Sequence, residues 1–252
     1  VSLGQRLGVG WLGGACGTCK YCRRGQENLC RQAAFTGYHR DGGYAEYLVA
    51  RAAFAYPLPE EWPPEALAPW LCAGLIGYRA YRLVQDREVL GFYGFGAAAH
   101  LLLQVAKHQG KRVYAFVRPG DEAAKGFALE LGAAWAGDST EAPPEPLEGA
   151  LLFAPVGALV PKALADTEPG GVVVLAGIHM SPIPEMPYSL LWEERVLRSV
   201  ANLTREDARA FLEIAPQVPV RAAVETFPLE EANRALEALR QGRLRGAAVL
   251  LP

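Results

Sequence analysis

The 252-residue chain has no long hydrophobic run and no large excess of charge of either sign. No apolar stretch approaches the roughly 18 residues of a membrane-spanning helix, so we expect no membrane partner. The formal net charge of −2 gives no reason to expect nucleic acid as a partner. The first residues lack the pattern of a secretory signal, which favours the reducing cytoplasm as the compartment. The hydrophobic fraction of 51% is typical of a soluble globular protein.

Cysteine is also scarce, and four of the five cysteines lie within residues 16–30. The first three have two residues between neighbours, and short turns of this kind let thiolates converge on one tetrahedral ion. We therefore predict a zinc site, in which four thiolates leave no position open to substrate and the metal is structural. The alternatives are a disulfide-stapled loop, a redox pair or unconnected thiols. The predicted ligands are Cys16, Cys19, Cys22 and Cys30.

Strand and helix signals alternate through the middle of the sequence. A short apolar run at residues 88–93 predicts a buried strand, and the residues after it predict a helix that ends before Gly110. Alternation at this spacing is typical of an α/β protein with a parallel doubly wound sheet. We predict strands at 88–93, 112–117, 150–153 and 171–176, and helices at 97–109, 121–131 and 160–164.

The flanking regions also contain element signals. An Asp-Gly-Gly turn introduces Tyr44–Val49, which we predict to be a strand. Near the C-terminus, residues 229–241 form an amphipathic pattern with leucines on one face and charges on the others. We further predict strands at 6–10, 220–226 and 247–251, and helices at 64–70, 75–83, 206–214 and 229–241.

The motif Gly94-x-Gly96-x-x-Ala99 lies directly between a predicted strand and a predicted helix, which is the context that a dinucleotide-binding turn requires. Gly94 permits the tight turn, and Gly96 lets the backbone approach a pyrophosphate at the helix N-terminus. Ala99 replaces the more common third glycine and is small enough for close packing of helix on strand. The alternative is a glycine-rich turn in an ordinary α/β protein.

The end of the second predicted strand bears on the choice of coenzyme. NAD sites usually place an acid there, which accepts a hydrogen bond from the ribose 2′-hydroxyl. Here the strand ends at Val117 and Arg118 follows, which can pair with a 2′-phosphate, so we favour NADP over NAD. Two alternatives stay open: Arg118 is a solvated loop residue, or Asp121 or Glu122 turns toward the ribose.

Four stretches, in this order, resemble the zinc-dependent alcohol dehydrogenases of the medium-chain dehydrogenase/reductase superfamily: Cys16–Cys30, Asp41–Tyr47, Leu71–Gly74 and Gly94–Ala99. The resemblance implies a Rossmann domain at residues 76–213, set within an incomplete GroES-like β-barrel domain at 1–75 and 214–252. It also implies homodimers or homotetramers, since Leu197–Leu203 is similar to the strand through which Rossmann sheets pair in this family. The implied activity is hydride transfer between a small alcohol, aldehyde or ketone and NAD(P).

The resemblance also implies roles for single residues. In this family a second zinc is catalytic and is held by two cysteines and a histidine. Cys72 resembles the last of these ligands, and a small buried core thiol is the alternative. Arg245 resembles an arginine that reaches the coenzyme pyrophosphate, and a surface charge is the alternative. Ile178 lies at a strand end similar to the loops that line the nicotinamide, while Ile76 stands where many relatives have a threonine.

The other catalytic ligands of the family have no counterpart in this sequence. The resemblance places them upstream of Val1, so we expect that the chain lacks an N-terminal segment; if it is complete, we expect weak or no alcohol oxidation. Two functions compete with this reading: a non-catalytic dinucleotide-binding module with structural zinc, and a zinc-independent reductase of the quinone-reductase type, against which the cysteine lobe and Cys72 argue. No histidine has a cysteine or histidine partner at ligand spacing, so each is predicted to be structural or solvated: His39, His100, His108 and His179.

Overall fold

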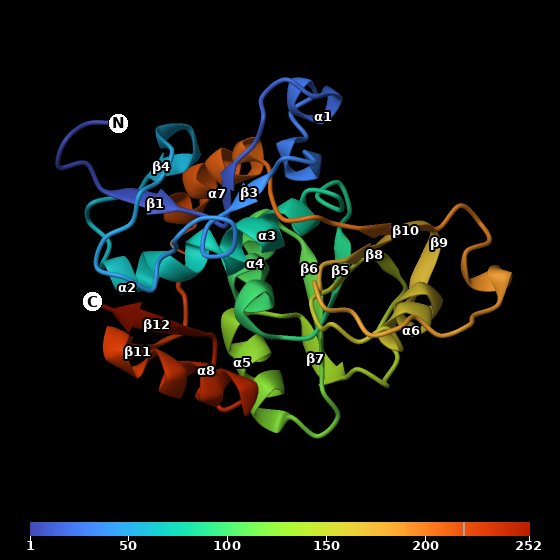
Figure 1. Cartoon of the computed structure of the whole chain (residues 1–252). Coiled ribbons are helices and arrows are strands. Elements are labelled where there is room, and N and C mark those ends of the chain that lie inside the picture. Colours follow the sequence, from blue (N-terminus) through green and yellow to red (C-terminus); the bar gives the residue numbers. More distant parts are fainter. Residues whose placement is uncertain (219) are drawn as a thin grey trace. The chain divides into compact units, whose positions relative to one another are not determined.

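The computed structural model describes residues 1–218 and 220–252, which fall into two compact units (Figure 1). One unit contains Val1–Ile76 and Asn202–Pro252, and the other contains Gly77–Ala201. The division predicted between residues 213 and 214 would cut through helix α7 (Arg205–Gln217). The structure groups the whole of α7 with the first unit, because Phe211 packs there so closely against Gly74 that a Cβ on Gly74 would lie 2.5 Å from its ring.

The Gly77–Ala201 unit is built on one six-stranded sheet in which every neighbouring pair is parallel. Its strand order is β10-β9-β8-β5-β6-β7, so the winding direction reverses between β5 and β8. This arrangement confirms the predicted doubly wound α/β sheet, and such a reversal is where open α/β sheets bind ligands. The strands are β5 (Val89–Tyr93), β6 (Arg112–Val117), β7 (Trp135–Asp138), β8 (Leu147–Leu152), β9 (Thr167–Leu175) and β10 (Val196–Ser199).

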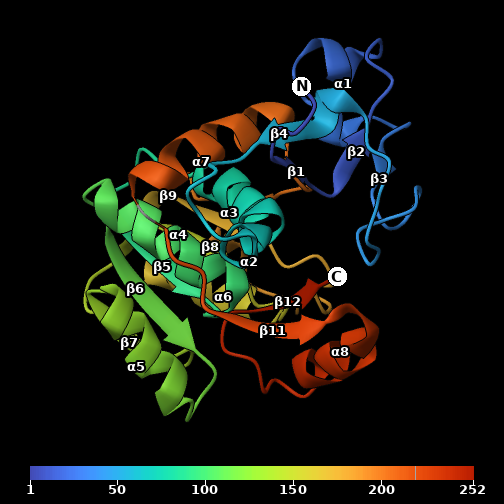
Figure 2. The ribbon, with the colours of Figure 1, turned by 90° about the vertical axis from the view of Figure 1, so that its left-hand side faces the viewer.

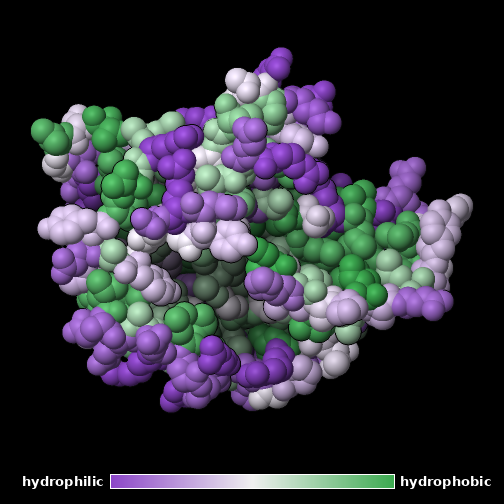
Figure 3. All heavy atoms as spheres, viewed as in Figure 1, coloured by the Kyte–Doolittle hydropathy of each residue, from purple (hydrophilic) through white to green (hydrophobic). Residues whose placement is uncertain are grey.

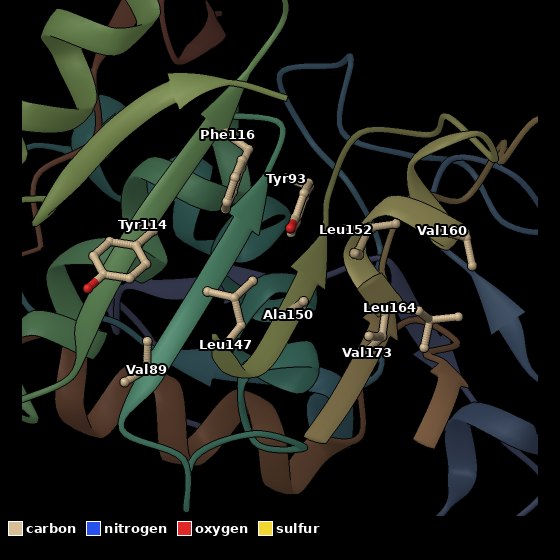
Figure 4. Packing of buried hydrophobic residues seen from close by; sticks show 11 residues of the cluster. Val89, Tyr93, Tyr114, Phe116, Leu147, Ala150, Leu152, Val160, Leu164 and Val173 are labelled. Atoms are coloured by element: carbon tan, nitrogen blue, oxygen red, sulfur yellow. The ribbon is translucent and has the colours of Figure 1, made fainter. Parts of the chain in front are cut away.

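Helices cover this sheet and enclose its core (Figures 1 and 4). On one face Tyr93 and Phe116 stack with ring centroids 4.1 Å apart and an interplanar angle of 1°. The Tyr93 hydroxyl donates to Asp166 Oδ2 at 2.5 Å, so this buried polar group is satisfied. The helices of the unit are α4 (Ala97–His108), α5 (Glu122–Leu131) and α6 (Leu159–Asp166), with a short 3₁₀ turn η4 (Tyr188–Leu190) and the last part of α3 (Ala73–Tyr81).

The described residues of the other unit form three two-stranded sheets. Two are antiparallel, β1 with β4 and β2 with β3, and the third is the parallel pair of β11 and β12, against which α8 packs (Figure 2). The strands are β1 (Leu7–Val9), β2 (Leu12–Gly14), β3 (Ala34–Phe35), β4 (Ala55–Pro57), β11 (Val224–Pro228) and β12 (Ala247–Leu251). The helices are α1 (Lys20–Arg23), α2 (Pro64–Leu67), α7 and α8 (Ala232–Arg240), with 3₁₀ turns η1 (Glu27–Leu29), η2 (Ala52–Phe54), η3 (Ala68–Leu71) and η5 (Leu229–Glu231).

The strand predicted at Tyr44–Val49 is wrong, because these residues form bends and extended chain with no ladder. Tyr47 and Val49 are 88% and 91% exposed. A strand is stable only when its N–H and C=O groups pair with a neighbour. No strand among residues 1–218 and 220–252 lies alongside this segment. Composition alone therefore does not make it a strand.

Two other features of the fold bear on the predictions. The strand predicted at 220–226 starts instead at Val224, where pairing with Ala247 of β12 begins. A helix long and apolar enough to cross a membrane is absent from the described part of the chain.

Candidate functional site

The structure brings the four clustered cysteines together. Their Sγ atoms all lie within 4.8 Å of one another, and the thiols are free rather than disulfide-bonded. Sγ of Cys22 lies 3.8 Å from that of Cys16 and 3.6 Å from that of Cys19. A tetrahedron with Zn–S bonds of about 2.3 Å has S–S edges of about 3.8 Å. The donor set and its spacing therefore fit one zinc ion.

The surroundings of these thiols shift their pKa values in opposite directions. Hydrogen bonds from the backbone of Thr18 and Cys19 lower the pKa of Cys16 to about 6. The backbone N of Cys19 lies 3.3 Å from the Sγ of Cys16. Partial burial and the neighbouring thiols raise the pKa of Cys22 to about 12. One thiol thus ionises readily, whereas its neighbour resists a second negative charge. A divalent cation at the centre of the four thiols would offset the repulsion between thiolates and favour ionisation of Cys22.

Glu27 ties this lobe, residues 16–30, to α7, a contact that the sequence analysis missed. Its Oε1 accepts hydrogen bonds from the backbone N–H of Arg205 at 3.0 Å and from Nε of Arg205 at 2.9 Å. Its backbone oxygen accepts from the N–H of Cys30 at 3.1 Å. Glu27 is only 4% exposed, although its nearest neighbours in the sequence are polar. The single sequence signal is that it is the one acid within the lobe.

Replacing Glu27 by glutamine is expected to reduce the free energy of unfolding by about 1 to 3 kcal/mol, the usual size for hydrogen bonds to a charged group. Burial alone would raise the pKa of Glu27, but the hydrogen bonds from Arg205 outweigh it and leave the pKa below its usual value. The ionised Glu27 side chain therefore stabilises the folded protein fully above about pH 4.3, the pKa of an unfolded glutamate. This stabilisation is lost as the pH falls through the lower pKa that Glu27 has in the folded state.

Urea unfolding at pH 7 and at pH 3 would measure this pH dependence. Glu60→Gln is a matched control, because Glu60 also pairs with an arginine, Arg6, but its side chain is 66% exposed. A Glu27→Gln deficit that is as large at pH 3 as at pH 7 would contradict the assignment.

The second candidate site lies where β5 ends at the reversal of the sheet. Gly94 has a φ of +89°, and a Cβ there would lie 2.7 Å from Ala154, so the turn requires glycine. Gly96 precedes α4 as its N-cap and provides no capping side chain. A Cβ on Gly96 would meet no atom within 4 Å. The backbone beside Gly96 is thus open to a ligand, and Ala99 is fully buried in the packing of α4.

Two loops join this turn at the carboxyl edge of the sheet. The N–H of Gly157, which follows β8, donates to Ser181 Oγ at 2.8 Å, and the N–H of Ser181 donates to Pro155 O at 3.1 Å. These bonds connect the loop after β8 to the loop after β9. Ile178 lies in the second loop and is 74% exposed. Ile178 is one of the residues predicted from the sequence to lie at the coenzyme site, whereas no local signal in the sequence pointed to Ser181.

The tip of β6 contains Arg118, whose side chain is 80% exposed and lies 3.6 Å from Asp121 Oδ2. Asp121 already caps α5 by accepting from the N–H of Ala124 at 3.0 Å. Lys125 contacts both Glu122 and Asp138 at 2.8 Å and lowers the pKa of Asp138. The acids near the tip are therefore engaged, while Arg118 extends into solvent. Val117 is buried at the end of β6.

The structure does not gather ligands around Cys72. This residue follows η3 and is exposed. Partial desolvation by the protein atoms around the thiol raises the pKa of Cys72. Within the described residues, the four-cysteine lobe is the only group of three or more potential metal ligands. His39, His108 and His179 are exposed, whereas His100 is fully buried. The roles predicted for Cys72 and for Arg245, which is exposed just before β12, stay predictions.

Comparisons with known proteins agree with this architecture. Residues 1–60 match the alcohol dehydrogenase GroES-like domain. The chain is 49% identical over 251 residues to a probable alcohol dehydrogenase AdhA of Mycobacterium tuberculosis, covering 98% of this chain and 72% of the relative. It is 34% identical over 260 residues to an alcohol dehydrogenase of Geobacillus stearothermophilus, covering 99% and 76%. Among solved structures, cinnamyl alcohol dehydrogenase SbCAD4 of Sorghum bicolor superposes with a TM-score of 0.90 at 26% identity, covering 99% of this chain and 75% of that one.

Proposed function

Because the chain belongs to the alcohol dehydrogenase family of oxidoreductases, we propose that it transfers hydride between a small alcohol, or the matching aldehyde or ketone, and NAD(P). The observation that carries the proposal is the open Gly94–Gly96 turn, which leads into the uncapped N-terminus of α4 at the sheet reversal. A helix N-terminus offers unpaired N–H groups and a positive dipole end to a pyrophosphate. When bound, the nicotinamide would supply the hydride acceptor, and the loop that carries Ile178 would line it.

We propose NADP rather than NAD as the preferred coenzyme, because the side chain of Arg118 is 80% exposed at the tip of β6 and the acids there are engaged. Replacing Arg118 by serine is expected to weaken NADPH binding about tenfold to a hundredfold and to leave NADH binding within about twofold. The loss of one charge-assisted hydrogen bond to a phosphate weakens binding by about this factor. Fluorescence titration of both coenzymes measures it, and equal losses for the two would contradict the assignment.

We also propose that Cys16, Cys19, Cys22 and Cys30 hold a structural zinc ion, with the chemistry occurring elsewhere. A catalytic zinc is a different matter, because the described residues do not supply Cys72 with a set of partners. The five free thiols agree with a reducing compartment such as the cytoplasm.

The isolation of Cys72 favours a second candidate, a dinucleotide-binding module without turnover. Coenzyme titration alongside an assay of alcohol oxidation by the 252-residue chain separates the candidates. Binding with turnover supports the dehydrogenase, and binding without turnover supports the module. Turnover that survives a strong chelator would favour a zinc-independent reductase of the quinone-reductase type. Absence of NADH and NADPH binding would contradict all three.

We propose that the protein forms a homodimer or homotetramer through β10. This strand is at the edge of the sheet, so one side of its backbone is unpaired within the unit. Hydrophobic side chains gather over β9 and β10 (Figure 3), and Val196 and Trp192 are 44% and 61% exposed. Val196→Lys is expected to shift the protein toward the monomer in sedimentation. Val156→Lys is the control, because Val156 is 43% exposed but lies off this edge; equal behaviour of the two variants would contradict the proposal.

A further inference from the structure

We propose that His100 is a positioning residue that orients the peptide group through which α4 binds the coenzyme pyrophosphate. This inference rests on the proposed dinucleotide site at the start of α4. His100 lies in the first turn of that helix and is fully buried. Burial excludes the solvated role that the sequence left open, and the reaction itself assigns the ring no task.

The imidazole ring contacts the glycine turn directly. Its Nδ1 lies 3.2 Å from the backbone oxygen of Gly96. A carbonyl oxygen only accepts hydrogen bonds, so Nδ1 carries the hydrogen and donates it. The same oxygen accepts from the backbone N–H of His100 at 3.1 Å. One residue therefore holds the Gly96 oxygen with two donors.

Fixing this oxygen fixes the donor on the other side of the peptide. In a trans peptide the C=O group and the next N–H group point in opposite directions in one plane. The N–H that follows Gly96 belongs to Ala97, the first residue of α4, and no side chain caps this end. Glycine has the widest backbone freedom of any residue, so the peptide after Gly96 is the part of the turn that most needs an external restraint. A donor held in place before binding costs less entropy when an anion arrives.

Aromatic packing holds the ring in this orientation. The ring centroid of His100 lies 5.7 Å from that of Phe127 on α5. Phe127 also meets Phe95, the residue between the two glycines, edge to face at 5.8 Å. The imidazole and the glycine turn thus share one aromatic neighbour. Rotation of the ring away from Gly96 would disturb both contacts.

The test compares His100→Leu, which removes the donor, with His100→Asn, whose side-chain amide can place a donor near the position of Nδ1. His108→Leu is the matched control, because His108 lies on the same helix but is exposed. Calorimetry with ADP and ligand-observed NMR with adenosine report binding with and without the phosphates, and thermal unfolding reports stability.

We expect His100→Leu to weaken ADP binding about threefold to tenfold, the range for one neutral hydrogen bond, and to leave adenosine binding unchanged. His100→Asn should recover most of the ADP affinity, and His108→Leu should match the wild type. Unchanged ADP affinity in His100→Leu, or an equal loss for ADP and adenosine, would overturn the inference. If the leucine variant does not fold, His100→Met, which also lacks a side-chain donor, replaces it with the same expected loss. Failure of the wild type to bind NADH or NADPH would instead overturn the proposed function.

Discussion

Replacing Cys30 by serine is expected to release the zinc ion of the cysteine lobe and to lower the melting temperature of the protein markedly. Cys30 is the most buried of the four thiols, at 6% exposure, and serine offers a much weaker ligand. The lobe has little hydrophobic core, since none of the residues of α1 is buried. Small segments of this kind depend on metal, and structural zinc contributes about 10–16 kcal/mol in zinc-finger peptides.

Native mass spectrometry of the purified chain measures the zinc content. We expect about one zinc per wild-type chain, as for a single closed four-thiolate site, and far less in Cys30→Ser. The matched control is Cys72→Ser, because Cys72 is the one cysteine outside the lobe, and it should keep the lobe zinc. A Cys30→Ser protein that retains one zinc equivalent would contradict the ligand assignment. Destabilisation of the wild type by a reductant alone would favour the disulfide alternative.

Replacing Gly96 by alanine is expected to weaken coenzyme binding about tenfold to a hundredfold, equivalent to about 1.4 to 2.7 kcal/mol, with no loss of protein stability. The added methyl group would meet no protein atom within 4 Å, and the φ of −108° at Gly96 lies outside the left-handed region that favours glycine. It would instead occupy the space through which a pyrophosphate approaches the backbone. We therefore expect the substitution to reduce coenzyme affinity and to leave the free energy of unfolding unchanged.

Gly94→Ala is the matched comparison two residues away, and we expect it to reduce the stability of the protein. Gly94 has a φ of +89°, and its Cβ would lie 2.7 Å from the backbone N of Ala154. We expect it to lower the free energy of unfolding by about 1 to 3 kcal/mol through strain and crowding. NADPH titration and urea unfolding of both variants provide the measurements. Full coenzyme affinity in Gly96→Ala would place the dinucleotide elsewhere.

Several elements could be predicted from the sequence because short-range signals determine them. The helix predicted at 97–109 is α4, Ala97–His108, which starts after Gly96 and ends before Gly110. The strands predicted at 88–93 and 112–117 are β5 and β6, because short apolar runs between turn residues suit buried parallel strands. The cysteine spacing likewise brought four thiols together through local turns at Gly17 and Gly25, both with positive φ.

By itself the sequence determined the α/β class, through strand and helix signals that alternate along residues 88–176. It also determined the glycine turn and the cysteine cluster, each encoded within about 15 residues. Only the tertiary structure decided the features that depend on distant partners. Tyr44–Val49 has the composition of a strand, but the described part of the chain offers no neighbouring strand with which it pairs. Glu27 meets Arg205 across 178 positions, and packing alone shows that His100 is buried against the turn it follows. Local propensity chooses an element, but long-range packing decides which side chains meet, because burial and pairing energies depend on parts of the chain that the local sequence does not contain.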